Sequence, residues 1–391
     1  MRQQRYRESQ GYGKGERLVN GFWLFAIIIF LAAVAAAFYI ISGKGGFSSR
    51  FSGKHAVITN AVEYRLSSGP KIVTIGGGTG LSTLLSGLKG FTRNITAVVA
   101  VTDEGGSSGR LRQEWGVLPP GDIRNCIVAL AENDSSLNRL LNFRFDRGEL
   151  KGHSLGNLIL LATTEMMGDF QRAVEELNKL LAIRGQVLPV TTETVTLKGE
   201  TDDGRQVSGE LQISDNGSHL TKLWLEPSNA ETLDAVKQAL SEADLIVLGP
   251  GSLFTSVLPN LLLKDISSFL KSSSVPIVYV ANLLTQPKET EGMNILAHVD
   301  WIASVIGAVP DYLLANQAQI PDDLLARYSK IGAQPLYLST KEEKYLESLG
   351  TTVIYGDYAE IKNGTYLRHN AQNLSESIMR LARESVSRED A

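Results

Sequence analysis

The sequence is poor in the residues that build covalent and metal frameworks. Its 391 residues include a single cysteine, Cys126, and five histidines. One thiol excludes an internal disulfide framework and a zinc site built from cysteines, and it fits a reducing compartment. Five histidines leave little room for a histidine-rich metal centre. With 43% hydrophobic and 20% charged residues, the chain as a whole has the composition of a globular protein.

Most of the chain also lacks an excess of positive charge. Residues 71–391 carry 29 Lys and Arg against 39 Asp and Glu, whereas residues 1–70 carry nine against three. A nucleic-acid surface needs clustered cations that neutralise phosphates. The acidic main body therefore predicts small ligands or protein partners, and no nucleic acid.

One long run without charge stands out, at residues 22–42. It has about the 20 residues that a helix needs to cross a hydrocarbon core, and Trp23 and Tyr39 stand near its ends as interfacial aromatics. We predict a transmembrane helix here; the alternative is a buried helix of a soluble core. Residues 1–21 then form a basic N-terminal segment, and residues 43–70 form a flexible tether.

A glycine cluster opens the globular body, which we expect to span residues 71–391. The cluster consists of Gly76, Gly77, Gly78, Thr79 and Gly80. A β-branched run precedes it and apolar residues at helical spacing follow it, so the pattern predicts a strand, a tight loop and a helix. Because glycines let backbone N–H groups approach a ligand and a helix N-terminus favours an anion, phosphate is the expected occupant. Leu81 stands where the dinucleotide fingerprint needs glycine and the P-loop lysine is absent, so neither familiar nucleotide motif is met; a purely structural turn is the alternative.

Two carboxylates follow the next predicted strand. Asp103 and Glu104 stand where open α/β sheets place ligands, and paired carboxylates there suit Mg²⁺ or a general base. The glycine- and serine-rich stretch after them adds backbone and hydroxyl donors at Ser107, Ser108 and Gly109. A helix cap and a surface turn are the alternative interpretation.

Polar residues also begin two predicted helices. They are Asp122, Arg124 and Asn125 in the first helix, and His153, Ser154 and Asn157 in the first turn of the second. Arg124 suits a bidentate phosphate contact, and Asp122 is either a candidate catalytic group or only an N-cap. His153 is a candidate general acid, and a hydrogen-bonded structural histidine is an equal alternative.

Two more buried strands are predicted to end in small or polar residues. These residues are Gly249, Gly251 and Ser252 after one strand, and Asn282 and Gln286 after the other. The carboxyl ends of parallel strands meet at one edge of a sheet. We therefore expect the loops at Gly76–Gly80, Ser107–Gly109 and Gly249–Ser252 to converge on one phosphate-binding cleft.

The rest of the body combines helices with a short antiparallel region. Alternating apolar and polar residues at about 190–226, around an Asp203-Gly204 turn, predict a small antiparallel β insertion. Helical spacing of apolar residues from Asn373 onward predicts a C-terminal amphipathic helix. The body is therefore predicted to be α/β.

Seven ordered motifs resemble the YvcK family, the gluconeogenesis factors. They are GGGTGLSTLLSGL, TDEGGSSGRLR, PPGDIRNC, GHSLGNL, GPGSLFTSVLPNLL, TQPKETEG and LRHN, and they extend over about residues 71–370. The resemblance implies a Rossmann-like domain with a three-layer α/β sheet, shared with CofD, the Mg²⁺-using 2-phospho-L-lactate transferase. It also implies a binder of UDP-sugars, UDP-N-acetylglucosamine or UDP-glucose, that influences cell shape, peptidoglycan precursor supply and growth on gluconeogenic carbon sources.

The resemblance also implies which residues of this chain form the binding site. The positions are the phosphate loop Gly76–Gly80, the acidic loop Asp103 and Glu104, and the sugar-nucleotide contacts Tyr328 and Arg368. The chain departs from the family pattern at three of its residues. Glu104 stands where a second aspartate is usual, Lys288 where glycine is usual, and Glu291 where aspartate is usual.

Three functions are consistent with these residues. The leading hypothesis is a membrane-tethered regulator that binds a UDP-sugar. The alternative is a Mg²⁺-dependent CofD-like phosphotransferase, in which Asp103 and Glu104 hold the metal and Arg124 neutralises charge on the transferred group. A nicotinamide-dependent oxidoreductase is a weaker third hypothesis, because of Leu81. Whether the chain is an enzyme, and whether it forms homo-oligomers, stays open.

Two arguments about cellular location point in opposite directions. Basic residues before the uncharged run mildly favour a cytoplasmic N-terminus, which would export the body. Nucleotide sugars and a lone Cys126 belong in the cytoplasm. We therefore expect a single-pass protein of the cytoplasmic membrane whose globular body lies in the cytoplasm.

Overall fold

The structure is a computed structural model that describes residues 63–132 and 136–389. The predicted basic segment, the predicted transmembrane helix at residues 22–42 and residues 43–62 of the predicted tether lie outside these residues. The described end of that tether, residues 63–70, is not a free linker: Leu66 is 1% exposed and its carbonyl oxygen accepts a hydrogen bond from Arg93 N (2.9 Å), so the globular body begins before residue 71. Within the described residues, no helix is both long and apolar enough to span a membrane. Residues 64–391 form the unit described below.

A parallel sheet lies at the centre of this unit. Its strands are β1 (Ile72–Gly76), β2 (Ile95–Val99), β3 (Gln186–Pro189), β7 (Leu245–Leu248), β8 (Ile277–Val280), β9 (Tyr312–Asn316) and β10 (Thr352–Gly356). They pair in the order β10-β9-β8-β7-β1-β2-β3, and every pairing is parallel. The residues of β1 and β7 are all buried, as expected of short apolar runs in a sheet that is covered on both faces.

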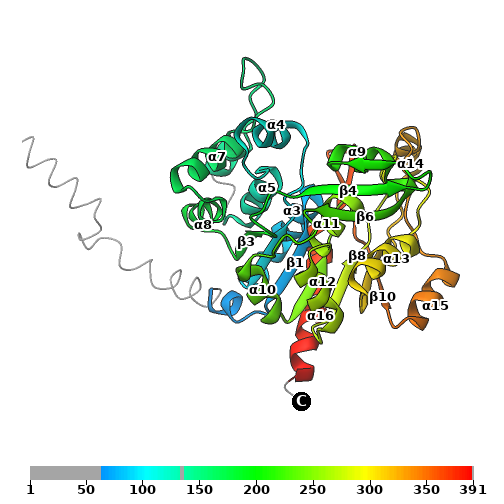
Figure 1. Ribbon diagram of the computed structural model, residues 1–391. Coiled ribbons are helices and arrows are strands. Elements are labelled where there is room, and N and C mark those ends of the chain that lie inside the picture. Colours follow the sequence, from blue (N-terminus) through cyan, green and yellow to red (C-terminus); the bar gives the residue numbers. More distant parts are fainter. Residues whose placement is uncertain (1–62, 133–135, 390–391) are drawn as a thin grey trace, which may run out of the picture. The chain divides into compact units, whose positions relative to one another are not determined.

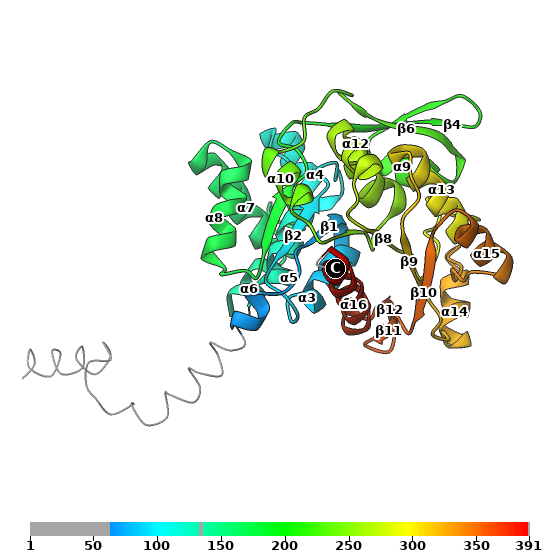
Figure 2. The ribbon, with the colours of Figure 1, turned by 90° about the horizontal axis from the view of Figure 1, so that it is seen from below.

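Helices supply that cover. Their bounds are α3 (Gly78–Leu88), α4 (Gly106–Trp115), α5 (Gly121–Leu130), α6 (Ser136–Asn142), α7 (Leu155–Met167), α8 (Phe170–Leu180), α9 (Glu210–Asn216), α10 (Asp234–Ser241), α11 (Leu258–Leu261), α12 (Lys264–Ser272), α13 (Ile295–Ile306), α14 (Asp322–Ser329), α15 (Thr340–Ser348) and α16 (Ala371–Glu389), with a 3-10 turn η1 (Gly217–His219) and a π-helical turn η2 (Leu253–Val257). Helices α3, α5 and α16 pack on one face of the sheet, and α10, α12 and α13 lie on the other (Figure 1, Figure 2). The predicted three-layer α/β architecture is confirmed.

The predicted antiparallel insertion is also present. Its strands are β4 (Thr196–Thr201), β5 (Gln206–Ser208) and β6 (Leu220–Glu226), which form a sheet of order β5-β4-β6. The turn between β4 and β5 has Gly204 at φ +82°, and the Asp203 carboxylate accepts a hydrogen bond from Thr201 Oγ1 (2.6 Å). Helix α9 follows β5 and packs against η2, so the insertion reaches the carboxyl edge of the main sheet.

The predicted C-terminal helix is α16, which follows a two-stranded antiparallel sheet of β11 (Ala359–Lys362) and β12 (Tyr366–His369). Leu374, Ile378 and Leu381 are buried, as the helical spacing predicts. Helix α16 packs on α3, where a Cβ atom at Gly87 would collide with the backbone carbonyl of Ala371. Glycine at this position lets the two helices approach closely.

The strand order creates a switch point at β1. The chain pairs β2 with one side of β1 and later returns to pair β7 with its other side. The connections that follow β1 and β7 therefore diverge over opposite halves of the sheet. Open α/β sheets bind their ligands in the crevice at such a switch point, outside the carboxyl ends of the strands.

Candidate ligand-binding cleft

A cleft of about 480 Å³ lies at this switch point, a volume typical of small-molecule sites. Its walls come from the loops after β1, β7 and β8, from helix α9 and from strand β12. The lining residues that the sequence predicts are Gly77, Gly78, Thr79, Gly80, Gly251, Ser252, Asn282, Gln286 and Arg368. Two of the three predicted glycine loops thus converge on one cleft.

The N-terminus of α3 offers this cleft a set of backbone donors. Gly77 is the N-cap, and it has no side chain that could cap the helix. Asp122 accepts a hydrogen bond from the Gly78 N–H. Gly80 packs on the loop after β7, where a Cβ atom would lie 2.5 Å from the Pro250 carbonyl oxygen. An anion bound here meets N–H groups and the positive end of the helix dipole.

The second glycine loop already has an internal anion. Glu289 is 1% exposed, and its Oε1 accepts hydrogen bonds from the Ser252 hydroxyl and from Phe254 N (3.0 Å). The backbone N–H of Thr255 also donates to this carboxylate. Burial raises the pKa of Glu289, and these hydrogen bonds oppose the shift. A ligand phosphate therefore meets more unoccupied donors at α3 than at the loop after β7.

A cationic wall faces the glycine loops from β12. Arg368 lines the cleft, and its Nη1 donates to the Leu367 carbonyl oxygen (2.9 Å). Tyr328 is not at the cleft surface; its hydroxyl accepts a hydrogen bond from Leu367 N (2.9 Å), which fixes the strand that carries Arg368. The neighbouring His369 Nε2 bonds the Ala281 carbonyl oxygen (3.1 Å), and burial lowers the pKa of this imidazole to about 4.

Three carboxyl groups lie beside the start of α3. Glu210 Oε2 accepts a hydrogen bond from Glu104 N (2.9 Å), and the Glu210 side chain also bonds Asp103. Burial, followed by the negative charge of Asp103, raises the pKa of Glu210. The same two causes raise the pKa of Asp122 to about 6. Two of the three groups thus retain protons at pH values where exposed carboxyl groups are ionised.

The residues predicted to hold Mg²⁺ face different neighbours. Asp103 Oδ1 accepts a hydrogen bond from Gly105 N (2.8 Å), whereas the Glu104 carboxylate lies against Gly209 at the start of α9. In the part of the chain that the structure describes, no three His, Cys, Asp or Glu side chains are arranged to hold a metal ion. The donor set does not fit a preformed Mg²⁺ site, and Mg²⁺ binding stays a prediction.

A second group of predicted residues forms a buried hydrogen-bonded chain outside the cleft. Arg124 Nε donates to Asn157 Oδ1 (3.3 Å), and Asn157 Nδ2 donates to Ser107 Oγ (3.1 Å). Ser107 Oγ lies 2.9 Å from His153 Nδ1. Burial, followed by the charge of Arg110, lowers the pKa of His153, so this imidazole is neutral at pH 7.

The remaining predicted residues lie in or beside the loops and helix starts. Ser154 is the N-cap of α7, so His153 precedes that helix and does not lie in its first turn as predicted. Ser108 Oγ accepts a hydrogen bond from Gly121 N (3.1 Å). Asn125 is half-buried on α5. The others are Gly76 at the end of β1, Gly109 in α4 and Gly249 directly after β7.

The structure adds cleft residues that the sequence did not single out. The polar ones are Thr83, Glu210, Ser214, Thr255, Glu289 and His369. Glu289 and His369 stand inside the motifs TQPKETEG and LRHN, which could have marked them. Glu210 carries no such signal, because its partner Glu104 is 106 positions away along the chain.

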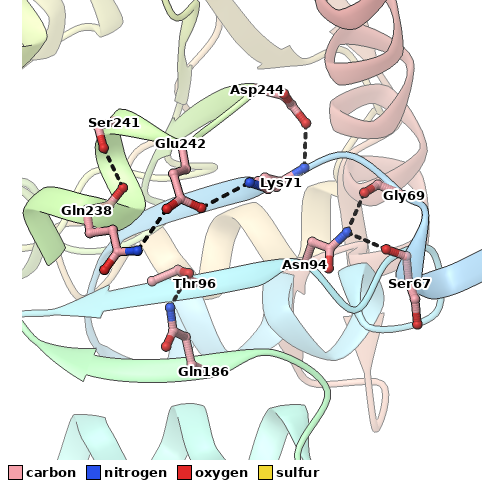
Figure 3. Close-up of polar contacts among 10 residues, drawn as sticks. All are labelled: Ser67, Gly69, Lys71, Asn94, Thr96, Gln186, Gln238, Ser241, Glu242 and Asp244. Carbon is pink, nitrogen blue, oxygen red and sulfur yellow. Dashed lines mark hydrogen bonds and ion pairs between the residues drawn. The ribbon is translucent and has the colours of Figure 1, made fainter. Parts of the chain in front are cut away.

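A second hollow, of about 510 Å³, lies at the opposite edge of the sheet, around the starts of β1, β2 and β3. Figure 3 shows that its polar side chains bond one another: Lys71 Nζ pairs with Glu242 Oε2 (3.0 Å), and Gln186 Nε2 donates to Thr96 Oγ1 (2.9 Å). The Asn94 amide donates to two backbone carbonyls. Because these groups are satisfied internally, we place the candidate site at the carboxyl edge.

Comparisons with known proteins agree in the family they indicate. The protein-family model for CofD, 2-phospho-L-lactate transferase, matches residues 72–359. The gluconeogenesis factor of Bacillus subtilis is 42% identical over 317 residues, which cover 81% of this chain and 99% of that protein. A putative gluconeogenesis factor from Nostoc sp. is 44% identical over 319 residues, 81% of this chain and 69% of that protein. A crystal structure of a UPF0052 family member from Bacillus halodurans has a TM-score of 0.76 and 42% identity, and the match covers 79% of this chain and 99% of that one.

Proposed function

Because the chain belongs to the gluconeogenesis factor family, which shares the CofD domain, we propose that its cleft binds a UDP-sugar and that the protein acts as a regulator. The observation that carries this proposal is the glycine-rich N-terminus of α3, whose N-cap residue Gly77 has no side chain, inside a cleft at the switch point. A diphosphate bound there takes hydrogen bonds from the backbone N–H groups of this first turn other than that of Gly78, which already donates to Asp122.

The opposite wall suits the rest of such a ligand. Arg368 has no carboxylate partner among the described residues, so its guanidinium is available to a second phosphate or to a ribose hydroxyl. Gln286 Oε1 is buried in the cleft lining without a hydrogen-bond donor. A sugar hydroxyl or the N–H of a uracil ring would supply that donor, which is the chemistry that UDP-N-acetylglucosamine and UDP-glucose share.

The protonation of Glu210 favours regulation over metal-dependent group transfer. Glu210 and Asp122 have raised pKa values, and Glu210 bonds Asp103. A protonated Glu210 that bonds Asp103 is a poor ligand for a metal ion, whereas Asp122, with a pKa of about 6, is mostly ionised at pH 7 and stays available as a base. The CofD-like phosphotransferase thus remains the alternative, and steady, Mg²⁺-dependent product release from a phosphoryl donor would establish it.

The cellular part of the proposal follows the family. We propose that occupancy of the cleft reports the supply of a peptidoglycan precursor, and that the protein thereby influences cell shape and growth on gluconeogenic carbon sources. Residues 22–42 would hold it at the cytoplasmic membrane with its globular body in the cytoplasm. Protease treatment of intact spheroplasts tests this topology, because removal of the globular body from outside would contradict it.

Calorimetric titration of the full-length protein with UDP-N-acetylglucosamine, UDP-glucose and GDP tests the binding. Arg368→Gln should weaken UDP-sugar binding by roughly 10- to 100-fold, the value of one charge-assisted hydrogen bond of about 1.5–3 kcal/mol. Arg383→Gln removes the same charge from an exposed position on α16 and should leave the affinity unchanged. No heat with either UDP-sugar, or equal losses in both variants, would contradict a site in this cleft.

A further inference from the structure

Three arginines gather around the buried pair Ser107 and His153, away from the cleft. We call Arg110 of α4, Arg124 of α5 and Arg144 of the loop between α6 and α7 the arginine cluster. This loop projects beyond α4 and α7 at the top of Figure 1. None of the three arginines lines the cleft at the switch point.

Arg124 carries the strongest indication of an absent partner. It is 7% exposed, yet the groups that bond its guanidinium are the neutral amide oxygens Asn157 Oδ1 (3.3 Å) and Asn142 Oδ1 (2.7 Å). Over the described ranges, no carboxylate forms an ion pair with it and no acceptor bonds its Nη2. A buried charge is costly unless it is paired, so this guanidinium is placed to meet an anion.

The other two arginines bring further charge to the same place. Arg144 Nη1 donates to the Gly152 carbonyl oxygen, and Arg110 Nη2 donates to the Lys151 carbonyl oxygen (2.6 Å), so both side chains lie beside the segment that leads into His153. Neither forms an ion pair with a described carboxylate. Burial, followed by the charge of Arg144, lowers the pKa of Arg124, and the charge of Asp122 opposes this only in part, so the two positive charges lie within interaction range. Like charges held together in this way repel unless an anion joins them.

The hydrogen-bonded chain fixes the direction of the remaining donors. Asn157 accepts from Arg124 through its oxygen, so its amide nitrogen must donate to Ser107 Oγ. The Ser107 hydroxyl hydrogen is then directed to His153 Nδ1, and His153 carries its own proton on Nε2. The chain and the arginines together present N–H donors, which suit a ligand that only accepts hydrogen bonds.

We propose that the arginine cluster is a second anion site, separate from the UDP-sugar cleft, and that it binds a phosphate group. A dianionic phosphate matches several guanidiniums better than a carboxylate does, because it has more acceptor oxygens and more charge. The group belongs either to inorganic phosphate or to a phosphomonoester. None of the three arginines lines the UDP-sugar cleft, so each site can be tested alone.

Titration of the full-length protein with inorganic phosphate and, separately, with glycerol phosphate tests this site. Arg144→Gln should weaken phosphate binding by roughly 10- to 100-fold, since it removes one charge-assisted contact from an exposed side chain. Arg124→Lys keeps the charge but loses the planar fork, and should weaken binding as well. Arg147→Gln is the matched control, because it removes the same charge from the same loop at a side chain that is 96% exposed.

The outcomes separate this site from the cleft. Weakened phosphate binding in Arg144→Gln and Arg124→Lys, with Arg147→Gln and Arg368→Gln unchanged, supports the second site even if no UDP-sugar binds. The probe with the higher affinity then identifies free phosphate or a phosphomonoester as the ligand class. Equal weakening in Arg147→Gln would mean a general charge effect and would overturn the proposal. So would phosphate binding that neither cluster variant changes, or no phosphate binding at all.

Discussion

Asp122 places a carboxyl group where a negative charge is poorly tolerated. Burial and the nearby Asp103 raise its pKa from 3.8 to about 6. Between these values the folded protein retains a proton that the unfolded chain releases, so stability falls as the pH rises through this window. Asp122→Asn cannot ionise and should be more stable than the wild type at about pH 8, by at most about 3 kcal/mol.

Urea unfolding at about pH 4 and about pH 8 checks this expectation, because the difference between variant and wild type should vanish at the lower pH. Asp146→Asn is a suitable control, since the Asp146 side chain is 90% exposed and should show no such dependence. A constant difference across the pH range would mean that Asp122 is ionised in the folded protein at all of these values.

At Lys288 the cost of a strained backbone opposes the gain from a surface ion pair. The φ of Lys288 is +65°, in the left-handed region that favours glycine. A non-glycine residue there costs about 1–2 kcal/mol, whereas the exposed pair of Lys288 Nζ with Asp215 Oδ1 (2.9 Å) contributes about 0–1 kcal/mol. Lys288→Gly should therefore raise the free energy of unfolding slightly. Asp215→Asn removes only the ion pair. If this variant lowers the free energy of unfolding by more than about 1 kcal/mol, the ion pair outweighs the backbone strain and Lys288→Gly should destabilise the protein.

The sequence predicts residues whose position alone indicates their chemistry. Glycines after a buried strand indicate backbone donors, and Gly77, Gly78 and Gly80 do line the cleft. The sequence cannot predict roles that depend on a distant partner. Glu289 bonds Ser252 across 37 positions, and the pairing of Arg124 with Asn157 spans 33. Such contacts exist only after the sheet has brought separate loops together.

At the scale of elements, the helical turn η2 depends on a carboxylate from another loop. Glu289 accepts hydrogen bonds from Ser252 Oγ and from the backbone of Phe254 and Thr255, at the N-terminus of that turn. Glu289→Gln retains one acceptor oxygen but loses the charge, and should lower the free energy of unfolding by about 1–3 kcal/mol. UDP-sugar affinity should not fall, because a negative charge is removed from the cleft.

Chemical denaturation and calorimetry on the same variant check both expectations. Glu291→Gln is the matched control in the same loop; its side chain is exposed, and its effect on stability should stay within about 0.5 kcal/mol. A loss of affinity in Glu289→Gln without a loss of stability would identify Glu289 as a direct ligand contact and not as the internal anion of η2.

The elements themselves were largely predictable, whereas their arrangement was not. The apolar runs that became β1, β2, β7 and β8 predict buried strands, and the alternation around Asp203-Gly204 predicts the insertion. Nothing local reveals that β7 pairs with β1, which is what creates the switch point. The loop after β2 was expected in the same cleft, but Ser107 bonds His153 and Asn157, because the chain passes through α4 to α8 before it returns to the sheet at β3.

At the scale of the whole molecule, the globular body has a hydrophobic core of its own. Residues 64–391 form one compact unit, and its buried hydrophobic residues run from Leu66 to Ala382. Deleting residues 1–43 therefore removes no residue of this core, and the free energy of unfolding should change by less than about 0.5 kcal/mol. UDP-sugar affinity should also be unchanged, since the cleft-lining residues begin at Gly77. If residues 22–42 anchor the protein in the membrane, the full-length protein should sediment with membranes and the truncated protein should stay in the supernatant. A truncated protein that still sediments with membranes would contradict the anchor. A truncated protein that binds the UDP-sugar more weakly would contradict a cleft built by the globular body alone.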